Sequence, residues 1–77
     1  MFKAFVLINS ELGIEEELVK KLRAIQNITQ VNLVYGNYDR IAKVEANTLK
    51  KVKDVITWKI MHLAEAKSTL IMIVVES

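Results

Sequence analysis

Two short segments near the ends of the chain are apolar at every position. They read AFVLI at residues 4–8 and LIMIVV at residues 70–75. A membrane-spanning helix needs roughly 18 or more apolar residues, so both segments are better explained as buried strands. Because alternate side chains of a strand point to opposite faces of its sheet, each segment offers large apolar groups to both faces. The fold must therefore cover both faces of a sheet.

The sequence between these segments alternates between helical and strand periodicity. One stripe of apolar residues at helical spacing runs from Ile14 to Ile25, and a second follows Asn47 and Thr48, either of which can cap a helix. Two central segments instead alternate apolar and polar residues, as half-buried strands do. The predicted order is strand, helix, strand, strand, helix, strand, over residues 3–9, 14–25, 29–35, 41–46, 49–63 and 69–76.

This order is typical of the ferredoxin-like βαββαβ sandwich, an α+β fold. Right-handed crossovers place both helices on one face of a four-stranded antiparallel sheet, with the first and third strands in its centre. The other face would leave the apolar side chains of the first and last strands in water. A second copy of the chain can cover them, since such a face is self-complementary. We therefore predict a dimer formed through the sheet, or a higher oligomer of dimers.

Length and composition limit the function classes. The chain of 77 residues has no proline and no linker-like segment, which indicates a single domain over residues 1–77. The absence of cysteine excludes disulfides and thiolate metal sites, and no signal-like segment is present, so we predict a cytoplasmic protein. A net charge of +2, with lysine and glutamate mixed along the helical segments, indicates a solvated surface rather than a nucleic-acid or membrane interface.

The stretch YGNYDRIAKVE, residues 35–45, contains the pattern of a tight hairpin. Gly36 and Asn37 predict a two-residue turn in which glycine takes a positive φ and Tyr35 and Tyr38 face each other. Such a turn exposes backbone N–H groups that can receive a carboxylate, while Asp39 can accept a hydrogen bond from an ammonium group. A zwitterion needs both. A purely structural turn, in which Asp39 binds nearby backbone, explains the same residues.

The segments VNLVYGNYDRIAKVEA and AKSTLIMIVV, separated by a capped helix, resemble the effector-binding domain of the Lrp/AsnC transcription regulators, also called the RAM domain. Gly36, Tyr38 and Asp39 match the G-x-Y-D turn of that family. Ser68 and Thr69 match the Ser-Thr pair that opens its fourth strand. The resemblance covers the whole chain.

The chain departs from the family pattern at three positions. The family often has glycine and valine before the fourth strand, where this chain has Glu65 and Ala66, and often has a second hydroxyl residue where this chain has Ile71. The resemblance also implies a stand-alone form, because the chain begins at Met1 and enters its first strand by Lys3, without a helix-turn-helix domain.

The resemblance implies a domain that oligomerises and binds a small effector, usually an amino acid. Transcription would then be modulated indirectly, through full-length regulators of the family, without direct contact to nucleic acid. The implied effector-binding residues are Tyr35, Gly36, Asn37, Tyr38, Asp39, Ser68 and Thr69.

Two other functions share this fold. An RNA-binding module of the RRM type needs stacking aromatic residues on its third strand, and DRIAKVEA has none. A small enzyme of the dimeric α+β-barrel type needs a polar cleft, but His62 is the only histidine. Ser10 and Thr48 precede helical segments and are interpreted as caps rather than nucleophiles. We therefore predict no catalytic activity, no metal site and no cofactor.

Overall fold

A computed structural model describes residues 1–75 of the chain, so that Glu76, at the end of the last predicted strand, lies outside the described residues. A π-helical segment, Ile56–Ile60, continues the second helix. The other elements are β1 (Phe2–Ser10), α1 (Glu15–Arg23), β2 (Ile28–Leu33), β3 (Arg40–Ala46), α2 (Leu49–Val55) and β4 (Ala66–Val74).

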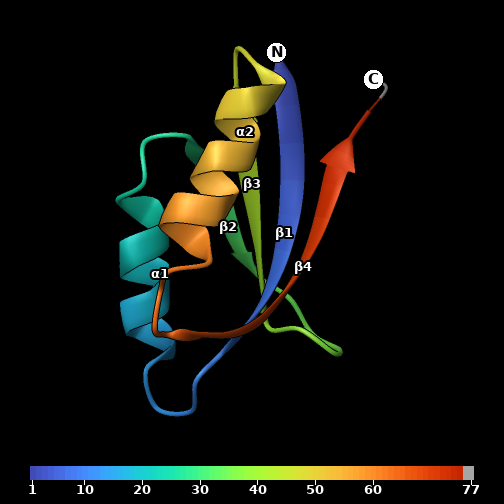
Figure 1. Cartoon of the computed structure of the whole chain (residues 1–77). Helices are drawn as coiled ribbons and strands as arrows, with labels where there is room; N and C mark the ends of the chain where they lie inside the picture. Colours follow the sequence, from blue (N-terminus) through green and yellow to red (C-terminus); the bar gives the residue numbers. More distant parts are fainter. Residues whose placement is uncertain (76–77) are drawn as a thin grey trace.

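The four strands form one sheet in the order β2-β3-β1-β4, and every neighbouring pair is antiparallel. Both helices cover the same face of this sheet, whereas none of the described residues forms a helix on the opposite face (Figure 1). The predicted ferredoxin-like βαββαβ fold is therefore confirmed. The largest differences lie at the start of β4, which begins three residues before the predicted strand, and at the end of the second helix, which stops three residues before the predicted end. Helix α1 is one residue shorter at its start and two at its end than the apolar stripe suggested.

The core lies between the sheet and the helices. Alternate residues of β1 point toward the helices and are fully buried, and the same alternation buries one face of β3, as the sequence predicted. From the helices, Leu18 and Leu22 of α1 and Val52 of α2 are fully buried against these strands. Burial of a large apolar side chain contributes roughly 1.5–3 kcal/mol, so this layer supplies most of the stabilisation of the fold.

The second helix begins with a side-chain cap and ends in a wider turn. The Thr48 hydroxyl accepts a hydrogen bond from the Lys51 N–H at 3.1 Å, which confirms one of the two predicted caps. At the other end, the Met61 N–H bonds the Ile56 carbonyl five residues earlier, at 2.9 Å. This π-helical turn keeps Ile56 and Ile60 in the core and leaves Trp58 outside it.

Candidate functional site

The loop between β2 and β3 is wider than the sequence predicted. Its last backbone pair joins the Val34 N–H to the Asp39 carbonyl at 3.0 Å, so four residues, 35–38, lie beyond it. The predicted two-residue turn is therefore wrong. Tyr35 does not face Tyr38, because Tyr35 is 94% exposed and Tyr38 is half-buried. The predicted positive φ of Gly36 is confirmed, at 128°.

Asp39 fastens this loop to the end of β1. Its carboxylate accepts hydrogen bonds from the Ser10 hydroxyl at 3.0 Å and from the Ser10 N–H at 3.2 and 3.3 Å. The Asp39 N–H donates to the Ile8 carbonyl at 3.1 Å. The helix-cap interpretation of Ser10 is thus wrong, because its hydroxyl is committed to Asp39 and the N-cap residue of α1 is Ile14, which makes no side-chain cap. The capacity of Asp39 is not exhausted, since a carboxylate has about four acceptor sites and Oδ2 uses one.

Asn9 joins the loop to β4, a role for which the sequence pattern gives no signal. Its side-chain amide donates to the Asn37 carbonyl at 2.8 Å and to the Ser68 hydroxyl at 3.2 Å. Asn9 and Ser68 are cross-strand partners at the end of the open sheet face. Only the pairing of β1 with β4 brings them together, and a β-bulge lies directly after this pair.

The predicted effector-binding residues are thus brought together only in part. Asn37, Asp39 and Ser68 gather at one end of the sheet through their contacts with residues 9–10. Thr69 pairs with Ile8, which is buried beneath the helices, so Thr69 belongs to the opposite face of the sheet. Tyr35 extends into solvent.

The backbone N–H groups of the loop are available to a ligand. Within residues 1–75, no N–H of residues 35–38 donates a hydrogen bond to the protein. The carboxylate of Asp39 follows these groups directly in the chain. The loop therefore combines a set of free donors with a carboxylate, the two features that the carboxyl and amino groups of a zwitterion need.

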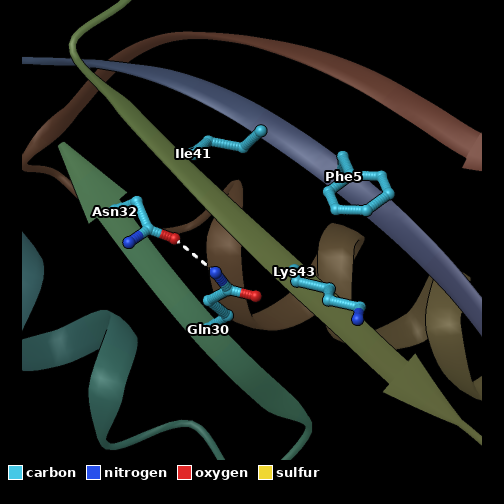
Figure 2. A pocket seen from close by; sticks show the side chains of 5 residues that line it. All are labelled: Phe5, Gln30, Asn32, Ile41 and Lys43. Carbon is cyan, nitrogen blue, oxygen red and sulfur yellow. Dashed lines mark hydrogen bonds between the residues drawn. The ribbon is translucent and has the colours of Figure 1, made fainter. Parts of the chain in front are cut away.

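The open sheet face begins beside this site. Its apolar side chains come from three strands, and Leu70 and Met72 are each 45% exposed. Figure 2 shows part of this face, where a shallow hollow of about 90 Å³ lies between Phe5 and Ile41, with Gln30, Asn32 and Lys43 at its edge. The Gln30 amide donates to the Asn32 side-chain oxygen at 2.7 Å, which orders the polar rim.

Glu65, one of the departures from the family pattern, has a structural role. Its carboxylate lies 2.7 Å from the Lys21 ammonium group, and its carbonyl accepts from the Glu11 N–H at 2.9 Å. The hydrogen bond from Lys21 lowers the pKa of Glu65, and the same bond raises the pKa of Lys21. These contacts join α1, and the loop between β1 and α1, to the segment before β4.

Neither a membrane-spanning helix nor a cluster of metal ligands is found in the part of the chain that the structure describes. None of its helices is long and apolar enough to cross a membrane. Over the same residues, no three His, Cys, Asp or Glu side chains gather as metal ligands would. His62 instead stacks on Trp58, with ring centroids 5.5 Å apart.

The geometry defines a class of protein: a small ferredoxin-like domain with an open apolar sheet face and a donor-rich loop at one end of that face. A model of the Lrp/AsnC ligand binding domain matches residues 3–77. The chain therefore belongs to the Lrp/AsnC ligand-binding domain family.

Solved structures agree with this assignment. The crystal structure of FFRP-DM1 is similar, with 40% identity and a TM-score of 0.91 over 97% of this chain and 100% of that one. Hypothetical protein PHS023 from Pyrococcus horikoshii has 39% identity and a TM-score of 0.90 over 100% of this chain and 93% of that one. No curated protein matches the sequence.

A longer regulator shares the fold alone. It is the transcriptional regulator NMB0573 from Neisseria meningitidis, solved as an L-Met complex, with 9% identity and a TM-score of 0.86. The match covers 99% of this chain and 51% of the regulator.

Proposed function

We propose that this chain is a single effector-binding and oligomerisation domain whose ligand is an amino acid. The effector site consists of the loop at residues 35–39 together with Ser68, and a second copy of the chain completes it. Through assembly with regulators of the same family, ligand binding modulates transcription indirectly.

The observation that carries the proposal is the pairing of free loop donors with the Asp39 carboxylate. Four N–H groups at residues 35–38 have no acceptor within residues 1–75, and they lie where Asn9 holds the Asn37 carbonyl at 2.8 Å. A carboxylate ligand gains several hydrogen bonds there without displacing a protein group. The ammonium group of the same ligand can pair with Asp39 Oδ2.

A second copy is part of the proposal for two reasons. The loop is exposed on a chain of 77 residues and cannot enclose a ligand by itself. The open sheet face reaches the site through Asn9 and Ser68, so a partner seated on that face also approaches the loop. Binding of L-methionine by a regulator with this fold supports an amino acid as the ligand class.

The test is a calorimetric screen of the purified chain against the common amino acids, followed by variants of the loop. Asp39→Asn keeps the size of the side chain and removes its charge. We expect it to weaken binding of the amino acid by about tenfold or more, because a hydrogen bond to a charged group contributes roughly 1.5–3 kcal/mol.

Ser10→Ala is the matched control. It removes the 3.0 Å hydroxyl bond to Asp39 and leaves the carboxylate in place. If Asp39 only fastens the loop, Ser10→Ala should weaken binding as well, whereas it should bind nearly as the wild type does if the Asp39 charge pairs with the ligand. If no amino acid binds the wild-type chain, the proposed ligand class is wrong.

A further inference from the structure

Besides the shallow hollow on the open sheet face, a groove lies on the helix-covered side of the molecule, between α1 and the start of β3. Its volume is about 410 Å³, and it is lined by Glu16, Val19, Lys20, Arg23 and Arg40. The four α1 residues follow the i, i+3, i+4, i+7 spacing of a single helical face. That face spans about 10 Å of the helix axis, which is the length of a small metabolite rather than of a single ion.

Arg40 reaches this groove because of its position in the sheet. It is the cross-strand partner of Ile8, which is fully buried beneath the helices, and directly paired residues share a face. Its guanidinium Nη1 donates to the Asp39 carbonyl at 3.0 Å. This bond holds one end of the guanidinium and leaves its other donors for a ligand.

Most of the positive charge of the groove is not neutralised by the residues that the structure describes. Within residues 1–75, Lys20, Arg23 and Arg40 have no ion-pair partner, whereas the neighbouring Lys21 is bound to Glu65. Glu16 offsets one of the three charges, which leaves a surplus of two. Val19 adds an apolar patch to the wall.

We propose that this groove binds a small phosphorylated molecule. A phosphoryl group carries nearly two negative charges near neutral pH and presents three acceptor oxygens, so it matches the surplus charge and the planar donors of arginine. An organic part of the ligand packs on Val19. The site is separate from the loop donors proposed for an amino acid, and its existence does not depend on them.

Binding in the groove also acts on the loop. The guanidinium that receives the phosphoryl group is the one bonded to the Asp39 carbonyl, and that carbonyl accepts the last backbone bond of the β2–β3 pair. A bound phosphoryl group therefore restrains Asp39, the residue at which the loop ends.

Phenyl phosphate is a suitable probe, titrated into the isotope-labelled chain while the backbone amides are followed by NMR. We expect saturable shifts at residues 16–23 and 40. Arg40→Gln should weaken binding by about tenfold, as should Arg40→Lys, which keeps the charge and loses the planar fork. Benzoate, a monoanion with the same ring, should bind much more weakly.

Lys53→Gln is the matched control, because it removes one positive charge from an exposed position on α2 outside the groove. Thermal melts verify that each variant is folded. Equal weakening by Lys53→Gln and Arg40→Gln would show that only net charge matters and would overturn the proposal, as would the absence of saturable shifts. Equal affinity for benzoate would overturn the phosphoryl class. Ser68→Ala, which alters only the proposed amino-acid site, should leave phenyl phosphate binding unchanged.

Discussion

Met72→Lys should separate assembly of the chain from its folding. Met72 lies on the open face of β4, directly opposite Phe5 of β1, and 45% of it is exposed in the single chain. A lysine at this position can keep its stem on the sheet and extend its ammonium group into water, so the fold should tolerate it. Seated against a second copy, the same ammonium group would lose water without gaining a partner.

The exposed fraction of Met72 sets the scale of the effect. Complete burial of a methionine side chain contributes roughly 1.5–3 kcal/mol, and somewhat less than half of this remains to be gained on assembly, about 1 kcal/mol. In a two-fold symmetric dimer the residue occurs twice, which gives about 2 kcal/mol before any cost of desolvating the two ammonium groups. The dimer dissociation constant should therefore rise by more than about tenfold.

Sedimentation equilibrium on wild type and variant measures this constant, with thermal melting as the test of folding. Leu12→Lys is the control, because Leu12 is 94% exposed in the loop before α1 and the substitution makes the same gain of charge. Refutation takes either of two forms: a wild-type chain that stays monomeric at micromolar concentration, or a Met72→Lys chain that associates as the wild type does.

Three further predictions concern stability. Gly36→Ala should lower the free energy of unfolding by about 1–2 kcal/mol, because a φ of 128° is strained for a residue with a Cβ. No other group lies within 4 Å of the added Cβ, so the effect is backbone strain alone, and an unchanged melting temperature would contradict it. Thr48→Ala should cost about 1 kcal/mol, seen as a fall of roughly 4–8 °C in melting temperature, whereas Asn47→Ala should have little effect; equal effects would refute the cap. The pKa of Glu65 is lowered chiefly by its hydrogen bond from Lys21. The pair therefore stabilises the fold fully at pH values above the ordinary glutamate pKa of 4.5, and this stabilisation is lost as the pH falls through the lowered pKa of Glu65 in the folded chain. Glu65→Gln should flatten the acid side of a plot of melting temperature against pH, and an unaltered acid slope would count against the pair.

The fold could be predicted because its signals are local. The alternation of β3 and the helical stripe of α1 are set by whether a position is buried, and the structure buries Val44, Leu18 and Leu22 as the periodicity requires. The apolar character of both faces of β1 likewise follows from its sequence. Only the ends of the elements differ, since they depend on caps and bulges rather than on periodicity.

The site could be predicted only in part, because its geometry depends on contacts between distant residues. The Gly-Asn pair favoured a two-residue turn, but Asp39 is held by Ser10 and Ile8 of β1, and these bonds place the last backbone pair at Val34 and Asp39. A serine 29 positions earlier gives no sign of this in the sequence. The role of Asn9 is hidden for the same reason, because its partners come from a loop and a strand that only the fold brings together.

Asn9 also gives a physical reason to expect that assembly and ligand binding are linked. Its side chain belongs to the open sheet face, yet its amide fixes the Asn37 carbonyl of the loop proposed to hold the effector. A partner that covers this face restrains Asn9 and Ser68, and so reduces the conformational freedom that the loop must lose when a ligand binds. The reverse holds by thermodynamic necessity, because a ligand that binds the assembled form more tightly stabilises that form in proportion to its differential affinity. Regulation by such a domain therefore needs no moving lid, since a ligand that prefers the assembled chain is enough to change how many copies associate.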